Sequence, residues 1–160
     1  MPLCEAEDLV SLLRSRGLTL STAESCTGGL IGGAVTAVPG SSDVFCGGIV
    51  SYSNDVKTKV LGVKEETLMA HGAVSEETAR EMAQGSMSLL GTRTAIAVTG
   101  IAGPGGATPS KPVGLVYIAV ADGPRVVVCR NVFEGDRDGI RRQAVSTACT
   151  LLKELIEGKL

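Results

Sequence analysis

The chain contains few aromatic residues and a single histidine. Its 160 residues include two Tyr, two Phe and no Trp. A hydrophobic core must therefore be built from aliphatic side chains. Histidine, the side chain that most often serves as a catalytic base, is nearly missing. The one histidine, His71, lies in a polar stretch and is predicted to be an exposed loop residue rather than a base.

Paired cysteines and clustered metal ligands are also absent from the sequence. The five cysteines are an odd number, and no two have the C-x-x-C spacing of a zinc or redox site. Reduced thiols in a cytosolic protein are the simpler interpretation. Because no cluster of His, Cys and carboxylates resembles a metal site, we predict no metal and no cofactor.

The sequence has no excess of positive charge and no long apolar run. Its formal net charge of −2 argues against a nucleic-acid partner. No apolar stretch approaches the ~20 residues of a membrane helix, and the N-terminus lacks the basic and apolar segments of a secretory signal. We therefore predict a soluble, cytoplasmic protein without a membrane partner. The sequence is compatible with a homo-oligomer but does not set the oligomeric state.

Hydrophobic residues make up 44% of the chain. Segments in which they have helical spacing alternate along the chain with segments in which they have strand-like spacing. The pattern predicts one domain over residues 1–160. Strands are expected at 18–22, 45–52, 94–98, 113–121 and 125–132. Helices are expected before Gly17, over 30–38, around Lys57, over 75–91 and over 136–157.

This alternation predicts an α/β fold whose largely parallel sheet is covered on both faces. The segment 99–112 contains too much Gly and Pro for a crossover helix, so the fourth strand is expected to run antiparallel to the third. Right-handed crossovers then favour the strand order 2-1-3-4-5. Ligands of such sheets bind at the switch point beyond the carboxyl ends. The turns that begin at Ala23, Ser53 and Thr99 should therefore meet there.

The first of these turns, Glu24 to Gly29, places Ser25 between a strand and a helix. Free backbone N–H groups at such a turn can stabilise the oxyanion formed when a nucleophile attacks an acyl carbon. Gly28 and Gly29 would let a substrate approach the backbone closely. Alternatively, the hydroxyl is only a helix cap, which is a commoner role. Cys26 is a rival nucleophile, but it has no evident histidine partner.

The second turn supplies a lysine that could replace histidine as the base. In a desolvated cleft the pKa of Lys57 would fall from ~10.4 toward neutrality, which would let its amine accept the serine proton. The alternative is that Lys57 is an ordinary solvated helix residue.

The third turn and the last helix suggest a pocket wall and an anion contact. Thr99 to Gly106 is rich in glycine but lacks the Gly-Lys-Ser/Thr of a phosphate-binding loop. Arg137, Arg141 and Arg142 open the last helix, which is an unfavourable end for cations. Their partner is either a substrate phosphate or the neighbouring Asp136 and Asp138.

Six motifs, in order, resemble the CinA C-terminal family over nearly the whole chain. They are Ala23-Glu24-Ser25-Cys26-Thr27-Gly28-Gly29, Tyr52-Ser53-Asn54-Asp55-Val56-Lys57, Gly72-Ala73-Val74-Ser75, Thr99-Gly100-Ile101-Ala102-Gly103-Pro104-Gly105-Gly106, Lys111-Pro112-Val113-Gly114 and Gly135-Asp136-Arg137. The family is known for nicotinamide mononucleotide deamidases of the PncC type. Many relatives carry a further N-terminal domain, and this chain resembles the stand-alone form.

The resemblance implies a three-layer α/β/α fold, no metal, and hydrolysis of the carboxamide of nicotinamide mononucleotide by Ser25 acting with Lys57. The small-molecule nucleotide is the expected partner. We expect its binding residues to be Glu24, Cys26, Thr27, Gly28, Tyr52, Thr99, Gly100, Gly103, Gly105, Gly106, Arg137 and Arg141. The role expected of Glu24 is to tune Lys57 or to orient the turn. Two alternatives remain: a nucleotide-binding or regulatory module without turnover, and an amidase for another pyridine compound.

Overall fold

The computed structural model describes residues 2–160 as alternating helices and strands. In chain order they are α1 Cys4–Arg16, β1 Leu20–Glu24, α2 Leu30–Thr36, a short 3-10 helix Ser41–Asp43, β2 Phe45–Val50, α3 Asn54–Leu61, α4 Glu65–His71, α5 Glu76–Leu90, β3 Thr94–Gly100, β4 Leu115–Asp122, β5 Arg125–Val132 and α6 Arg137–Ile156.

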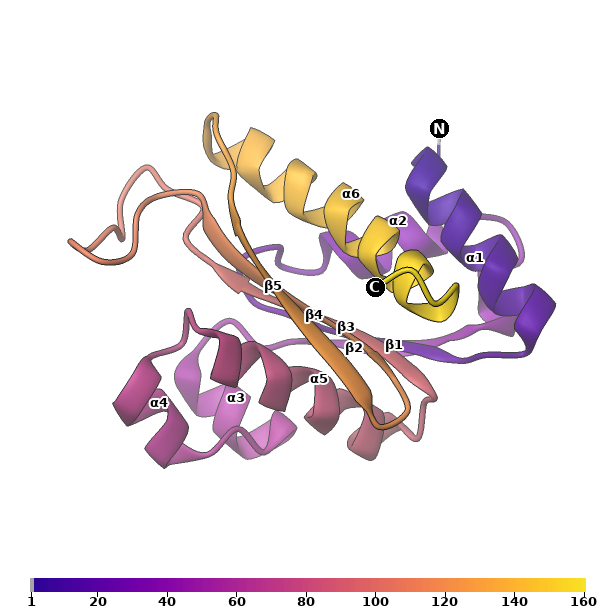
Figure 1. The fold of residues 1–160 in the computed structure, drawn as a ribbon, viewed down its shortest axis with the longest axis horizontal. Coiled ribbons are helices and arrows are strands. Elements are labelled where there is room, and N and C mark those ends of the chain that lie inside the picture. Colours follow the sequence, from indigo (N-terminus) through magenta and orange to yellow (C-terminus); the bar gives the residue numbers. More distant parts are fainter. Residues whose placement is uncertain (1) are drawn as a thin grey trace.

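The elements form three layers with the sheet in the middle. Helices α1, α2 and α6 cover one face, and α3, α4 and α5 cover the other (Figure 1). The strand order is β2-β1-β3-β4-β5. Strands β2, β1 and β3 are parallel, whereas β3 and β4, and β4 and β5, pair antiparallel. The predicted fold class, strand order and direction of the fourth strand are thus confirmed.

The register of the parallel strands brings their carboxyl ends to one edge of the sheet. Glu24 at the end of β1 is opposite Val50 of β2 on one side and Val98 of β3 on the other. The pairing continues past the strands, because Ser51 N–H donates to Glu24 O at 2.8 Å and Ser25 N–H donates to Val98 O at 2.9 Å. The first residue of each following turn is therefore fixed to the neighbouring strand.

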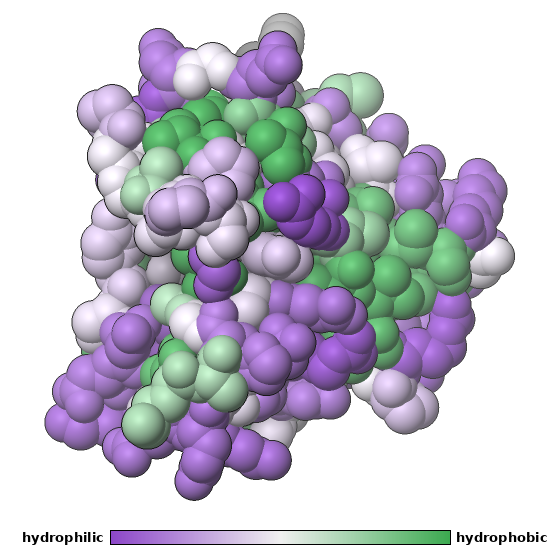
Figure 2. Space-filling view, turned by 60° about the vertical axis from the view of Figure 1, so that its left-hand side comes forward, coloured by the Kyte–Doolittle hydropathy of each residue, from purple (hydrophilic) through white to green (hydrophobic). Residues whose placement is uncertain are grey.

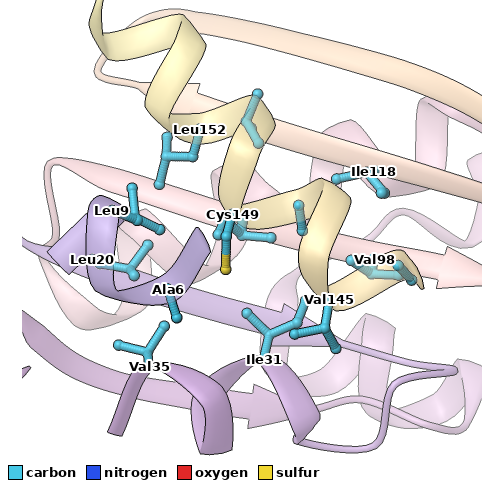
Figure 3. Packing of buried hydrophobic residues seen from close by; sticks show 14 of the residues in the cluster. Ala6, Leu9, Leu20, Ile31, Val35, Val98, Ile118, Val145, Cys149 and Leu152 are labelled. Carbon is cyan, nitrogen blue, oxygen red and sulfur yellow. The ribbon is translucent and has the colours of Figure 1, made fainter. Parts of the chain in front are cut away.

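Aliphatic side chains fill both spaces between the sheet and its helices, as the scarcity of aromatic residues requires. On the side of α1, α2 and α6, side chains from all three helices meet those of β1, β3 and β4 (Figure 3). On the other side, small sheet residues, Ala23, Ala97 and Ala119 among them, pack against α3 and α5, and Met82 of α5 is buried in the same cluster. Small side chains there let the helices lie close to the sheet.

A glycine in α5 allows α3, the helix that carries Lys57, to pack tightly. A Cβ at Gly85 would overlap the carbonyl oxygen of Leu61, the last residue of α3. Ser53 begins α3 by accepting a hydrogen bond from the Val56 N–H at 3.2 Å, as a capping serine does. The position of Lys57 is therefore set by both ends of its helix.

Helix α4 was not predicted from the sequence. His71, expected in a loop, is the last residue of this helix, although it is exposed as predicted. Seven residues with no buried side chain give little periodic signal, which explains the omission. The long loop between β3 and β4 returns toward α4, where Lys111 Nζ donates to the His71 carbonyl at 2.6 Å.

The surface of the described residues is mixed in character. Hydrophobic side chains gather in separate patches between hydrophilic ones on the face seen in Figure 2. The most exposed large hydrophobic side chain is Met69 at 88%, and Tyr52 is 62% exposed. Within residues 2–160 no helix has the length and apolar character needed to cross a bilayer.

Candidate active site

Ser25 and Lys57 meet at the carboxyl edge of the sheet. The Ser25 hydroxyl lies 3.0 Å from Lys57 Nζ, within the hydrogen-bonding distance expected if the first two turns converge. Ser25 directly follows β1, and Lys57 reaches it from the first half of α3. The alternative that Ser25 caps a helix is wrong, because α2 starts at Leu30 and Gly29 is its cap residue.

Lys57 is buried rather than solvated. Only 1% of the residue is exposed, and Nζ donates to the Ser51 carbonyl at 2.8 Å and to the Tyr52 carbonyl at 3.2 Å. Burial lowers the pKa of this amine, since removal from water penalises the charged form. A neutral amine has two N–H donors and one lone pair. In that neutral state, with both donors held by the two carbonyls, the lone pair is left for the Ser25 hydroxyl, whereas in the charged state the third N–H donates to Ser25 Oγ.

Glu24 lies beneath the turn and holds it. Its carboxylate accepts hydrogen bonds from the Thr27 hydroxyl at 2.7 Å and from the N–H groups of Ile31 and Gly32, both at 2.9 Å. The residue is only 2% exposed. Of the two roles expected for Glu24, orienting the turn is the one that these contacts support.

Cys26 is a poor nucleophile in this environment. Burial raises the pKa of its thiol to about 11, which leaves the thiolate scarce at neutral pH. The Cys26 N–H, by contrast, donates to no other residue among residues 2–160 and is directed only at its own sulfur. It follows the serine directly, the position from which a backbone N–H stabilises an oxyanion in hydrolases with a strand-turn-helix nucleophile.

A cavity of about 270 Å³ opens over the Ser25–Lys57 pair. Its lining comes from all three turns, from the loop before α5 and from the start of α6. The lining residues are Ser25, Cys26, Tyr52, Asn54, Lys57, Ala73, Val74, Thr99, Gly100, Ile101, Ala102, Gly103, Gly105, Gly106 and Arg137. Lysine and arginine are the only ionisable side chains among them apart from the Cys26 thiol and the Tyr52 phenol, so no carboxylate faces the cavity.

Arg137 spans the mouth of the cavity. Its guanidinium donates to the Gly103 carbonyl at 2.7 Å and to the Tyr52 hydroxyl at 3.2 Å. Tyr52 and Arg137 are both exposed, whereas Gly103 is buried. The contact ties the second turn, the glycine loop and α6 together at the entrance. Arg137 forms no ion pair with Asp136 or Asp138, the alternative partners considered from the sequence.

Four residues expected to bind substrate do not line the cavity: Glu24, Thr27, Gly28 and Arg141. Thr27 is completely buried, and its hydroxyl is bonded to Glu24. Arg141 donates to the backbone carbonyls of Cys26 and Thr27 at 3.0 and 3.3 Å. Gly28 has a φ of +58°, and a Cβ there would lie 3.3 Å from the Arg141 guanidinium. Gly28 therefore makes room for an arginine rather than for a substrate.

Sequence reasoning missed five residues of the lining: Asn54, Ala73, Val74, Ile101 and Ala102. All lie inside the motifs that carry the family resemblance, so a signal was present. Thr99 connects two of these motifs, because its hydroxyl donates to the Ala73 carbonyl at 2.8 Å. Among residues 2–160, no three His, Cys, Asp or Glu side chains are grouped so that they could hold a metal ion.

We expect Glu24→Ala to lower the free energy of unfolding by about 3 kcal/mol or more, because two buried donors and one partly buried donor would lose their acceptor. Glu24→Gln should lower the free energy of unfolding by less than Glu24→Ala. Its amide oxygen can still accept the hydrogen bonds of one carboxylate oxygen, but its NH₂ group would face an N–H where the other oxygen had been. Urea unfolding measures both. The exposed Glu76 is the matched control, and Glu76→Gln should change stability by no more than about 0.5 kcal/mol. Equal stability of Glu24→Ala and the unsubstituted protein would contradict the assigned role.

Fold and site together define an α/β protein with a buried serine–lysine pair at the carboxyl edge of its parallel strands. The family model for the CinA C-terminal domain matches residues 4–156. The chain belongs to this family.

Curated relatives and solved structures agree with this assignment. A CinA-like protein from Chloroherpeton thalassium is 52% identical over 160 residues, covering 98% of this chain and 38% of the relative. A CinA-like protein from Thermotoga maritima is 46% identical over 153 residues, covering 96% of this chain and 37% of the relative. This chain thus spans less than two fifths of the length of these relatives.

Two solved structures match over almost their full length. The competence/damage inducible protein CihA from Agrobacterium tumefaciens is 44% identical with a TM-score of 0.90, covering 98% of both chains. A CinA superfamily protein from Klebsiella pneumoniae is 36% identical with a TM-score of 0.92, covering 96% of both chains.

Proposed function

We propose that the protein hydrolyses the carboxamide of nicotinamide mononucleotide to nicotinate mononucleotide and ammonia. The observation that carries this proposal is the Ser25 hydroxyl 3.0 Å from a buried lysine amine, at the base of a cavity that contains no carboxylate. A serine hydroxyl beside a base of lowered pKa is the arrangement used in nucleophilic acyl transfer. The family resemblance adds the substrate to this chemistry.

The first half of the reaction transfers the acyl group to the enzyme. Neutral Lys57 takes the proton of the Ser25 hydroxyl while Oγ bonds to the carboxamide carbon, and the carbonyl oxygen becomes an oxyanion. The Cys26 N–H donates to that oxygen. As the intermediate collapses, the C–N bond breaks, the Lys57 ammonium returns its proton to the leaving nitrogen, and ammonia departs. The product is a nicotinoyl ester of Ser25.

The second half repeats these steps with water as the nucleophile. Lys57 removes a proton from the water, whose oxygen bonds to the ester carbon. Ser25 Oγ then leaves and takes its proton back from Lys57. The product is released as the carboxylic acid and ionises to the carboxylate by giving its proton to solvent, and both side chains regain their starting protonation states. One net water molecule is consumed for each ammonia formed.

The remaining lining residues suit a negatively charged pyridine nucleotide. Glycine and small apolar residues wall the interior, and its volume is at the small end of ligand pockets. A pyridine carboxamide fits this interior while the ribose phosphate extends toward the mouth. Arg137 lies at this mouth and would bind the phosphate, which would replace its hydrogen bonds to Gly103 and Tyr52.

Ammonia release from the mononucleotide is the direct test. We expect steady turnover by the purified protein that survives incubation with a strong chelator, because neither half of the reaction uses a metal ion. Nicotinamide riboside and free nicotinamide serve as comparison substrates. Binding of the mononucleotide without release of ammonia would instead favour the regulatory module, and turnover confined to another pyridine amide would change the substrate.

The pH dependence of kcat/KM should report the Lys57 amine. Only the neutral amine accepts a proton, and its fraction grows as the pH rises. Since burial lowers the Lys57 pKa, the rising limb should lie below the ~10.4 of an ordinary lysine. Initial rates at low substrate concentration from the acidic through the alkaline range measure this limb. A rate that falls over the same range would contradict a lysine base.

A further inference from the structure

The three arginines that open α6 have different environments, although the sequence treats them alike. Arg137 lines the cavity, and Arg142 forms an exposed ion pair with Asp138 at 2.7 Å. Arg141 lies between them in sequence but neither faces the cavity nor pairs with a carboxylate. Its half-buried guanidinium is directed at the turn that carries Ser25.

Arg141 is bonded to the backbone of that turn at two points. Nε donates to the Cys26 carbonyl at 3.0 Å, and Nη2 donates to the Thr27 carbonyl at 3.3 Å. Gly28, in its left-handed conformation, leaves space for Nη2 at the same place. Two adjacent carbonyls gripped by one rigid, planar group have little freedom to rotate.

The orientation of these peptides matters to the nucleophile. A trans peptide is planar, so the Cys26 carbonyl and the Thr27 N–H point to opposite sides. With the carbonyl held toward a guanidinium outside the cavity, it cannot turn toward the Ser25 hydroxyl. Arg141 thereby holds residue 26 through the peptide that follows it. The N–H of residue 26 lies in the preceding peptide, whose Ser25 carbonyl accepts from the Gly28 N–H at 3.0 Å within the same turn.

The helix that carries Arg141 is firmly packed. Arg141 lies within the 20-residue helix α6, and its neighbours Ile140, Ala144 and Val145 are buried against the sheet and α2. On the opposite side, Glu24 holds the same turn through Thr27. The turn therefore lies between two charged side chains that belong to different elements, and neither of them lines the cavity.

We propose that Arg141 is a positioning residue that fixes the two peptides following Cys26, the residue after the nucleophile, and that it does not bind the substrate phosphate. This inference rests on the proposed function in that it takes Ser25 as the nucleophile. It assigns to Arg137 the phosphate contact that the sequence left open among Arg137, Arg141 and Arg142.

The test measures Ser25 reactivity without the natural substrate. A fluorophosphonate probe should label Ser25 in the unsubstituted protein, as followed by mass spectrometry. Arg141→Ala should label at least about tenfold more slowly, a smaller effect than the 10²–10³ for removing an oxyanion donor itself. Arg142→Ala is the matched control and should label at the unsubstituted rate. Arg141→Lys, which keeps the charge without the paired donors, should be intermediate.

Turnover separates positioning from phosphate binding. Arg141→Ala should lower kcat by the same factor for the mononucleotide and the riboside and leave KM nearly unchanged, whereas Arg137→Ala should raise KM for the mononucleotide only. A higher KM for the mononucleotide alone in Arg141→Ala would overturn the inference, as would labelling at the unsubstituted rate. If Arg141→Ala does not fold, Arg141→Lys decides by the same two measurements. An unsubstituted protein whose Ser25 is not labelled would refute the proposed nucleophile instead.

Discussion

Ser25→Ala is expected to lower ammonia release from nicotinamide mononucleotide by about 10⁴-fold or more, the size of effect seen when a nucleophile is removed. The fold should be unaffected, because within residues 2–160 the hydroxyl hydrogen-bonds only to Lys57 and a methyl group fits the same space. Substrate affinity should also persist, since the other lining residues are unchanged. Initial rates together with thermal unfolding and equilibrium binding measure all three quantities.

Cys26→Ala is the matched control for this substitution. The neighbouring thiol is largely protonated at neutral pH, and the variant keeps the backbone N–H. Most activity should therefore remain. Thiol alkylation that stops turnover, in a protein that tolerates Ser25→Ala, would make Cys26 the nucleophile.

The arrangement of the strands could be predicted because it depends on local patterns that agree with one another. The glycine- and proline-rich segment 99–112 is unsuited to a crossover helix, which predicts the antiparallel direction of β4. The switch between β1 and β3 then follows from right-handed connections. Helix α4 was missed because its residues bury no side chain and so leave no periodic pattern.

The meeting of Ser25 and Lys57 could be predicted from topology, but the burial of the lysine could not. A lysine in a polar motif is usually solvated, and nothing in Asn54 to Leu61 indicates that its amine points inward. Burial depends on Ser51 and Tyr52, whose carbonyls receive the amine, and on Gly85, which brings α3 against α5. These are contacts between distant segments.

The roles of the charged residues around the site were also inaccessible from spacing. Arg137 and Arg141 are four residues apart and lie on one side of α6, so the sequence gives both the same expectation. Their roles differ only because of how the Ser25 turn lies against α6. Arg137 reaches the cavity mouth, and Arg141 reaches the Cys26 carbonyl. From the sequence, Glu24 is likewise expected to line the pocket. In the structure its carboxylate instead accepts hydrogen bonds from three donors of the turn and of α2.

Replacing Lys57 should be nearly as damaging as replacing Ser25. Lys57→Met, which keeps the length of the side chain, should lower the rate by about 10²–10⁴-fold, the usual contribution of a general base. In combination with Ser25→Ala it should add little, because groups that act as one unit are strongly non-additive. A double variant whose loss equals the product of the two single losses would argue against a shared step.

Lys57→Arg distinguishes a base from a fixed positive charge. A guanidinium remains protonated over the whole accessible pH range, so it can donate to the Ser51 and Tyr52 carbonyls but cannot accept the Ser25 proton. We expect this variant to be as inactive as Lys57→Met and to lose the alkaline rising limb of kcat/KM. If Lys57→Arg retained most of the rate, the lysine would act only by its charge, and another group would have to take the proton from Ser25.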